Sequence, residues 1–360
     1  MPQTPLHAEH ARLGASFTDF GGWDMPVRYT SDLAEHEAVR TKAGLFDISH
    51  MAEIFVSGPQ AASFLDYALV IQSSAIAIGK AKYALICNAQ GGIIDDLIVY
   101  RLADDEFLVI ANAGNRHEVV AALKERAIFQ GFVGVEDRSD DFALLAVQGP
   151  EATEKLQTIV DVDLSTLPYY SIDKGVIDGV AGYLCRTGYT GEDGFEVLVP
   201  AENSVQIFNA LINAGIIPCG LAARDTLRLE AGMPLYGHEL NLKINPYQAG
   251  LGRVVKLDRD ADFVGKSALQ SLSTKEANPV LVGLTGEGKR AARAEYKIFN
   301  GETEIGEITS GALSPTLGYP VAMAYVERNF SAIGSKVEVD IRGNRLEMTV
   351  VKLPFYKRSK

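Results

Sequence analysis

The sequence predicts an α+β protein built from three parts. A chain of 360 residues is too long for one ordinary hydrophobic core, so two or three domains are expected. Two stretches, residues 52–126 and 142–214, follow the same order of strands and helices. Beyond about residue 275, short β-rich segments recur between glycine turns, which is typical of an all-β domain. We therefore expect two related α+β units followed by a sandwich- or barrel-like domain.

The composition predicts an acidic globular protein that binds neither nucleic acid nor membranes. Hydrophobic residues make up 47% of the chain and charged residues 22%, as in soluble proteins. With 34 basic against 46 acidic residues the formal net charge is −12, so the basic field that attracts phosphates is missing. The first residues lack the apolar core of a signal peptide, and no apolar run approaches the length of a membrane span.

The cysteines predict a reducing compartment. There are three, Cys87, Cys185 and Cys219, which are widely spaced and lie in apolar contexts. This number and spacing fit neither a disulfide framework nor a zinc site. We therefore expect a cytoplasmic protein without a metal site.

The first 51 residues precede the repeat. Residues 17–32 hold the only tryptophan among glycines and a proline, which is typical of a packed, irregular loop. A helix is expected next, with Ser31 or Asp32 as its N-cap and an end near Gly44. Residues 45–58 alternate in polarity and are rich in β-branched residues, which predicts a strand.

Each copy of the repeat begins with a strand, a Gly-Pro pair and a helix that has the proline at its first position. In the first copy, strands within 91–102 and 106–113 and a helix over about 115–126 follow. In the second copy, the strands lie within 179–189 and 194–200 and the helix over about 201–214. The order β-α-β-β-α predicts a ferredoxin-like, split β-α-β unit. Opposed loops of two such units form a natural cleft.

The rest of the chain is predicted to form a helix, a linker and a β domain. Residues 220–256 begin as a helix in which Arg224 and Arg228 share one face. Residues 258–279 are polar and end in Pro279, which indicates a linker. The β-rich segments of the last domain lie within 280–288, 295–301, 304–315, 321–327, 336–343 and 346–355.

Two adjacent aspartates, Asp95 and Asp96, interrupt an apolar strand over residues 93–100. A strand that is apolar on both faces is usually buried on both, and burying an ionised carboxylate is costly unless it is paired. Either aspartate could cap a turn or pair with an arginine. Two in succession in so apolar a run favour a functional role for at least one of them.

Three further carboxylates, Glu192, Asp193 and Glu196, follow in residues 188–196. Glu192 and Asp193 lie at the expected turn, where acidic residues are common. Glu196 lies inside a strand between two apolar residues. A carboxylate at the mouth of a pocket can accept two parallel N–H bonds from a guanidine-like edge, as found in pterins and purines.

Conventional catalytic motifs are missing from the sequence. There is no G-x-S-x-G, no H-E-x-x-H and no P-loop, and the G-x-G at residues 250–252 lacks the third glycine of a dinucleotide-binding loop. His50 stands alone at the end of a strand-like run and is expected to be structural. The residues by themselves thus predict a three-part protein with a carboxylate-lined cleft.

Nine blocks, in order along the whole chain, resemble the glycine cleavage system T-protein family of tetrahydrofolate-dependent aminomethyltransferases. The blocks are residues 4–29, 39–51, 88–100, 147–150, 186–196, 220–237, 263–269, 306–318 and 352–358. The resemblance implies a three-domain cloverleaf around a central folate channel. It divides the chain into a folate-binding domain (1–51 plus 138–256), an inserted ferredoxin-like domain (52–137), and a linker with the C-terminal barrel or jelly-roll-like domain (257–360).

The resemblance also implies a reaction and a protein partner. In this family the lipoyl arm of H protein carries an S-aminomethyl group into the channel. Tetrahydrofolate takes up the one-carbon unit as 5,10-methylenetetrahydrofolate, and ammonia and dihydrolipoyl H protein are released.

The family's site residues map onto seven positions. Asp96 matches the catalytic aspartate beside folate N10, where it would stabilise the developing positive charge. Glu196 matches the pterin-binding glutamate, and Arg224 matches the ligand-binding arginine. The positions that match or adjoin the channel lining are Met51, Tyr83, Asn112 and Tyr189.

Two alternatives and four departures qualify the resemblance. The alternatives are a folate-dependent demethylase and a non-enzymatic folate-binding relative of iron–sulfur cluster assembly, whose Lys-Gly-Cys signature is missing here. The departures, at the channel rim or the H-protein docking surface, are Ala52, Arg253, Tyr319 and Lys357.

Overall fold

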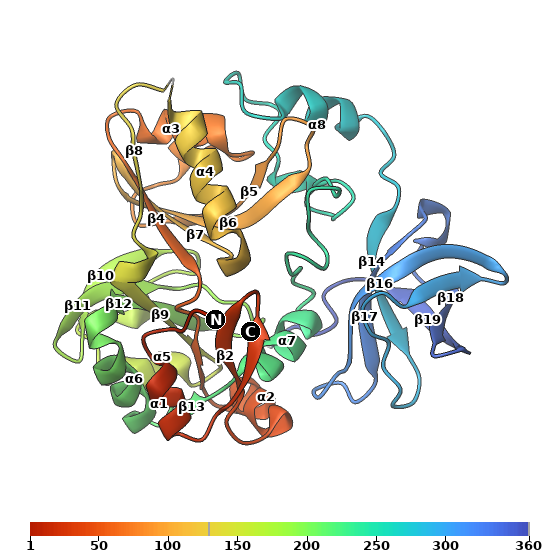
Figure 1. The fold of residues 1–360 in the computed structure, drawn as a ribbon, viewed down its shortest axis with the longest axis horizontal. Helices are drawn as coiled ribbons and strands as arrows, with labels where there is room; N and C mark the ends of the chain where they lie inside the picture. The colour runs from red at the N-terminus through yellow and green to blue at the C-terminus, as the bar shows by residue number, and fades with distance from the viewer. Residues whose placement is uncertain (129, 359–360) are drawn as a thin grey trace.

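The structure, a computed structural model, describes residues 1–128 and 130–358. Its strands form two open sheets, a closed six-stranded barrel and a separate two-stranded hairpin. Figure 1 shows the two sheet units one above the other, with the barrel beside them. The predicted α+β architecture with a C-terminal barrel is therefore confirmed.

The first sheet comes from residues 52–137 and has the strand order β5-β6-β7-β4-β8. Its strands are β4 (Ala52–Ser57), β5 (Ala81–Cys87), β6 (Ile93–Ala103), β7 (Glu106–Ala111) and β8 (Gly134–Asp137). Helices α3 (Ala61–Ala68) and α4 (Arg116–Ala127) cover one face, where Phe64 and Leu123 are fully buried. The order β6-β7-β4-β8 is the predicted ferredoxin-like one, and β5 is a further strand at the edge of this sheet.

The second sheet has the order β10-β11-β12-β9-β3-β13. Its strands are β3 (Gly44–Asp47), β9 (Phe142–Gln148), β10 (Ile172–Ile177), β11 (Val180–Cys185), β12 (Gly194–Pro200) and β13 (Ile217–Pro218). Its outer face packs on α1 (His7–Arg12), α5 (Ala152–Gln157) and α6 (Ser204–Asn213). Residues that precede and follow the first sheet unit in the sequence thus form a single second sheet. The predicted domain boundaries at residues 51, 137 and 256 stay a prediction.

The repeat is present, and each copy contains one strand that was not predicted from the sequence, β5 in the first and β10 in the second. Each lies at the edge of its sheet and pairs with a single neighbour. In β10 only the first and last residues are buried, so its sequence lacks the apolar alternation of an interior strand.

The prediction that proline opens the first helix of each copy is wrong. The helices begin at Ala61 and Ala152, two residues after Pro59 and Pro150. The N–H of each alanine donates to the carbonyl of the glycine before the proline, at 2.9 and 3.0 Å. The proline therefore occupies the second position of a turn, which suits its fixed φ.

Residues 45–58 form two strands in different sheets, not the single strand predicted. The backbone turns between them, because Ser49 N donates to Asp47 Oδ1 at 2.9 Å and Met51 N donates to Ile48 O at 3.0 Å. The chain passes from the second sheet to the first sheet at this turn.

Residues 17–32 are also more regular than predicted. They include most of a hairpin of β1 (Ser16–Phe20) and β2 (Trp23–Arg28). Gly21 and Gly22 form its turn with φ of +57° and +89°, a conformation that favours glycine. The two predicted helices follow as α2 (Asp32–Thr41) and α7 (Leu221–Glu230).

The barrel closes through its first and last strands. Its strands are β14 (Val280–Gly286), β15 (Lys297–Asn300), β16 (Thr303–Leu313), β17 (Pro320–Val326), β18 (Lys336–Ile341) and β19 (Asn344–Val351). The predicted linker contains α8 (Lys266–Ser273), whose Leu269 is buried in the core of the first sheet unit. Within residues 1–128 and 130–358, no helix combines the length and apolar character of a membrane span.

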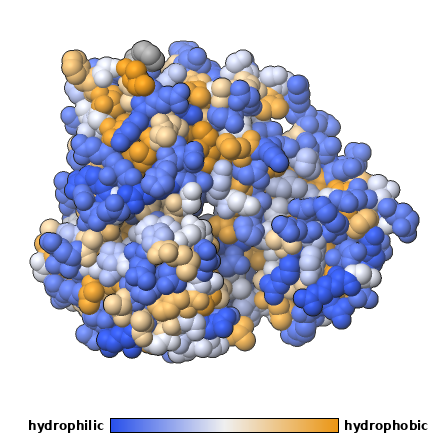
Figure 2. All heavy atoms as spheres, viewed as in Figure 1, coloured by the Kyte–Doolittle hydropathy of each residue, from blue (hydrophilic) through white to orange (hydrophobic). Residues whose placement is uncertain are grey.

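The inner faces of the two sheets pack on each other. Phe55 and Tyr100 of the first sheet share a core with Phe46 and Leu144 of the second and with Leu227 of α7. Strand β6 is therefore covered on both faces, as its sequence predicts. The outer surface in Figure 2 is largely hydrophilic and is hollowed near its centre, where the three parts meet.

Candidate functional site

A cavity of about 590 Å³ lies between the two sheets and is bordered by the β1–β2 hairpin and the segment after α7. The structure brings all seven predicted site residues to its wall: Met51, Tyr83, Asp96, Asn112, Tyr189, Glu196 and Arg224. They come from the first sheet unit, the second sheet unit and α7. Their individual roles stay a prediction.

Asp96 lies on β6 and faces the cavity. Tyr83 donates its hydroxyl hydrogen to Asp96 Oδ2 at 3.1 Å, and Asn112 Nδ2 donates to Oδ1 at 2.8 Å. Tyr83 stands on the neighbouring strand β5, while Asn112 directly follows β7 on the other side. Strands on both sides of β6 thus fix the orientation of this carboxylate.

Asp95 points to the opposite face of β6 and has a structural role. Its carboxylate is fully buried and accepts from Asn112 N at 2.9 Å, Asn112 Nδ2 at 2.8 Å and Asn115 Nδ2 at 2.7 Å. These bonds tie the end of β7 and the start of α4 to β6. The two aspartates therefore divide the functions that the sequence left open, one holding the backbone and the other facing the cavity.

The aspartate pair is poised to take up a proton above the ordinary aspartate range. Burial raises the pKa of both carboxyl groups, and the negative charge of Asp96 raises the pKa of Asp95 further. Hydrogen bonds from Asn112 oppose this rise in both groups. Such a carboxylate is suited to exchange a proton with a bound amine near neutral pH.

The opposite wall of the cavity carries Glu196 on β12. Its Oε2 accepts a hydrogen bond from Thr187 Oγ1 at 2.6 Å, and the Thr187 hydroxyl lies 2.7 Å from the Tyr100 hydroxyl. Burial raises the pKa of Glu196, while Thr187 and the charge of Arg224 lower it. One hydrogen bond leaves acceptor capacity on a carboxylate, which has about four lone-pair sites.

Arg224 brings a positive charge into the cavity from α7. Its guanidinium carbon lies 4.8 Å from the centre of the Tyr189 ring, and the Tyr189 hydroxyl donates to Pro234 O. Among the described residues, no carboxylate forms an ion pair with Arg224, and burial lowers its pKa. A partly buried cation without an anionic partner among the described residues is suited to bind an oxygen atom of a ligand.

Several cavity residues were not singled out from the sequence. Asn115 holds Asp95, and Thr187 holds Glu196. The three-residue spacing of Asn112 and Asn115 after an apolar strand was an available signal for the first. His50, expected to be structural, lines the cavity. No sequence pattern distinguishes it from a core histidine.

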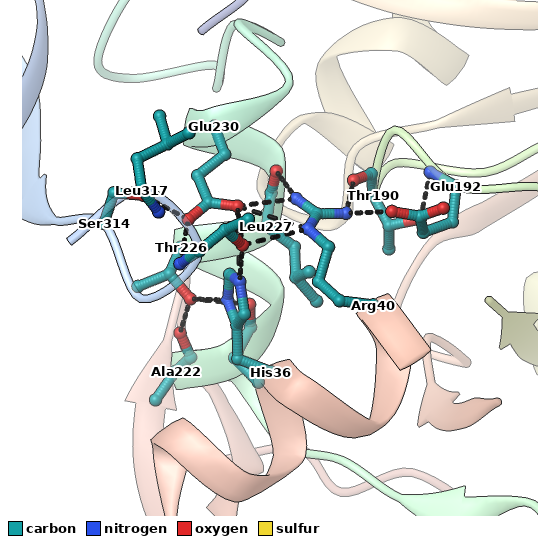
Figure 3. Close-up of polar contacts among 12 residues, drawn as sticks. His36, Arg40, Thr190, Glu192, Ala222, Thr226, Leu227, Glu230, Ser314 and Leu317 are labelled. Carbon is teal, nitrogen blue, oxygen red and sulfur yellow. Dashed lines mark hydrogen bonds and ion pairs between the residues drawn. The ribbon is translucent and has the colours of Figure 1, made fainter. Parts of the chain in front are cut away.

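A buried polar cluster, centred on Glu230, holds α7 and thereby the position of Arg224. Figure 3 shows Arg40 of α2 between Glu230 of α7 and Glu192 of the loop before β12. Arg40 Nη2 lies 2.8 Å from Glu230 Oε2, and Arg40 Nη1 lies 2.8 Å from Glu192 Oε1. His36 and Ser314 also contact Glu230, so the barrel is part of the same cluster. The cluster thus joins α2, α7 and the loop before β12 to the barrel.

The Glu230 cluster makes the stability of the protein depend on pH in the acid range. Burial opposes ionisation, but hydrogen bonds from His36, Ser314 and Arg40 lower the pKa of Glu230 from 4.5 to about 2. Because this pKa is lower in the folded than in the unfolded state, its stabilisation is present above pH 4.5 and is lost as the pH falls toward 2. We expect this ionised carboxylate to contribute roughly 3 kcal/mol to the free energy of unfolding at neutral pH. The melting temperatures of the wild type and of Glu230→Gln should differ most at pH 7, and this difference should be smaller at pH 3. A difference that does not depend on pH would contradict this assignment.

Of the four departures from the family pattern, one is buried and three are exposed. Ala52 is fully buried at the start of β4, opposite Ala111 of β7. Arg253, Tyr319 and Lys357 are exposed. None of the four lines the cavity in the described part of the chain.

Comparisons with known proteins cover nearly the whole chain. A family profile described as the GCVT N-terminal domain matches residues 6–259, and one described as the glycine cleavage T-protein C-terminal barrel domain matches residues 280–357. A curated protein from Saccharopolyspora erythraea named "Aminomethyltransferase" is 53% identical over 99% of this chain and 98% of its own length. One of the same name from Streptomyces coelicolor is 54% identical over 99% and 98%. The crystal structure of glycine cleavage system aminomethyltransferase T from Bartonella henselae superposes with a TM-score of 0.94 at 37% identity, over 99% and 98% of the two chains.

Proposed function

This chain belongs to the glycine cleavage T-protein family of aminomethyltransferases, and we propose that its co-substrate is tetrahydrofolate and its partner lipoylated H protein. The transferred group is the aminomethyl group on the dihydrolipoyl sulfur of H protein. The products are 5,10-methylenetetrahydrofolate, ammonia and dihydrolipoyl H protein. We place this reaction in the cytoplasm.

The observation that carries this proposal is the pairing of two chemically different walls in one cavity. Asp96, with Tyr83 and Asn112, offers a fixed carboxylate at one wall. Glu196 and Arg224 offer an acceptor and a donor at the other. A pterin presents two N–H donors and an adjacent carbonyl oxygen along one edge, which complements a carboxylate beside a guanidinium. The amines to be bridged would then lie toward Asp96.

The reaction needs no external oxidant or reductant. Two N–H protons leave N5 and N10 of tetrahydrofolate as the methylene carbon bonds to both nitrogens. The C–S bond and the C–NH₂ bond of the aminomethyl group break, and the two protons end on the sulfur and on ammonia. Asp96 would hydrogen-bond N10 and stabilise the positive charge that develops as these bonds rearrange. Holding both substrates in one cavity would supply much of the remaining rate.

A single-turnover assay tests this function. Aminomethylated H protein is mixed with the protein and tetrahydrofolate, and ammonia and methylenetetrahydrofolate are followed together. We expect both products in equal amounts. Tight folate binding without ammonia release would contradict the proposal and favour the non-enzymatic relative. Formaldehyde-equivalent transfer from an N-methyl amine, with none from H protein, would favour the demethylase.

Glu196→Gln should weaken folate binding. Replacing the carboxylate with an amide removes one of two charge-assisted acceptors, so the Kd for tetrahydrofolate should rise about 10- to 100-fold. Calorimetric titration measures this change, and kcat at saturating folate should stay within a few-fold of the wild-type value. Glu202→Gln, at an exposed position outside the cavity, is the matched control and should leave the Kd unchanged. An unchanged Kd for Glu196→Gln would contradict its assignment to the pterin.

A further inference from the structure

His50 differs from the other buried histidines of the described chain. His10 contacts Asp47 and Tyr29 through its two ring nitrogens, each at 2.8 Å. His36 likewise contacts Thr226 and Thr316, each at 2.8 Å. His50 is only 2% exposed, yet its Nδ1 has no hydrogen-bond partner among the described residues. A buried polar atom without a partner usually indicates an absent ligand or water.

The position of His50 points to a ligand. It lies in the turn between β3 and β4, next to Met51, and lines the same cavity as Asp96. The Phe20 ring meets the imidazole edge-to-face with a centroid distance of 5.6 Å, which fixes the ring plane. The imidazole is thus held by packing, while its Nδ1 makes no hydrogen bond to the described protein.

Burial and a nearby positive charge keep His50 in its neutral form. Burial and the positive charge of Arg224 on α7 lower the pKa of His50 to about 4, and Asp47 on β3 partly opposes this. Asp19 of the hairpin lines the same cavity. At neutral pH, therefore, His50 is a proton acceptor, and once protonated it would be a strong enough acid to give the proton up again.

The proposed reaction has two departing protons and, in the assignment above, one acceptor. Asp96 is assigned to N10, which leaves the N5 proton without a base. Arg224, whose positive charge acts on both Glu196 and His50, lines the same cavity as these two residues. Along a pterin, the N–H edge, the C4 carbonyl and N5 follow one another in order. Glu196, Arg224 and His50 offer an acceptor, a donor and an acceptor to these three groups within one cavity.

We propose that His50 is a further catalytic residue, which accepts the N5 proton of bound tetrahydrofolate and returns it to the departing amine. This inference rests on the proposed function. The N5–H bond breaks as the N5–C bond forms, and the electron pair of that N–H bond stays on N5. The proton resides on the imidazole and then moves to the leaving nitrogen as ammonia forms. The imidazole is regenerated in its neutral form.

The test compares His50→Asn and His50→Phe with the wild type. Asparagine keeps a hydrogen-bonding atom near the Nδ1 position but cannot take up the proton, and phenylalanine keeps the ring shape without nitrogen. We expect the single-turnover rate constant to fall about 100-fold in both, with the Kd for tetrahydrofolate within about threefold and the melting temperature nearly unchanged. His117→Asn is the control, because His117 is exposed on α4 away from the cavity and should keep full activity.

The possible outcomes separate this inference from the function it rests on. If the wild type releases ammonia and both His50 variants keep the full single-turnover rate constant, the inference is wrong and the function stands. If the losses follow a lowered melting temperature or a raised Kd alone, His50 is structural or binds substrate without exchanging a proton. If the wild type itself forms no ammonia, the proposed function fails first.

Discussion

Asp96→Asn is expected to lower the rate of methylenetetrahydrofolate formation by about 100- to 10,000-fold, the range that a positioned acid–base group contributes. The amide has the same shape as the carboxylate, and its oxygen can still accept from Asn112 Nδ2 while its N–H₂ donates to the Tyr83 hydroxyl oxygen. It cannot take a proton or balance positive charge at N10. Because the substitution also removes a negative charge beside Asp95, the fold should not lose stability. Rapid-quench measurement of both products, with folate affinity and thermal unfolding alongside, checks this result.

The neighbouring position offers a matched control. Asp95 accepts three N–H bonds from Asn112 and Asn115, so Asp95→Asn would turn an amide N–H₂ toward those donors. We expect this variant to lose thermal stability, whereas Asp96→Asn loses turnover. If Asp96→Asn unfolds the protein and keeps its specific activity, then Asp96 is structural and the assignment of the pair is wrong.

Arg40→Met should destabilise the protein by about 3–5 kcal/mol, because it leaves Glu230 and Glu192 buried without their cation. The side chains of these carboxylates are 0% and 5% exposed, and Arg40 itself is 6% exposed. A decrease in melting temperature on the order of 5–10 °C is expected for a chain of this size. Arg40 also packs on the Tyr356 ring, with its guanidinium carbon 4.0 Å from the centroid, so the C-terminal segment should loosen too.

Two comparisons show whether the loss comes from unpaired buried charge. Arg28→Met breaks an exposed pair with Asp32, in which the side chains are 46% and 41% exposed, and should cost less than about 1 kcal/mol. Adding Glu230→Gln to Arg40→Met removes one of the two unpaired charges and should recover part of the stability. Equal losses for Arg40→Met and Arg28→Met, or purely additive effects in the double variant, would contradict the proposed coupling.

Much of the fold follows from local patterns in the sequence. The apolar period of residues 93–100 predicts a strand that is buried on both faces, and β6 is one. The duplicated order of strands and helices predicts the two sheet units, and the glycine-punctuated end of the chain predicts a β barrel. Local patterns failed where a neighbour decides the conformation. The edge strand β10 is an example, because only its first and last residues are buried and its pairing with β11 makes it a strand.

The chemical types at the candidate site could also be predicted from the sequence, because carboxylates within apolar strands are easily recognised. What the tertiary structure alone decided is which of them meet. Apart from the family resemblance, the residue pattern could not distinguish Asp95 from Asp96, because the division depends on Asn112 and Asn115, which follow a different strand. Nor could it distinguish His50 from His36, since one lines a cavity and the other joins a buried cluster. Side-chain period determines the face of an element on which a residue lies, but the groups opposite that face come from distant parts of the chain, and only the packed structure brings them together.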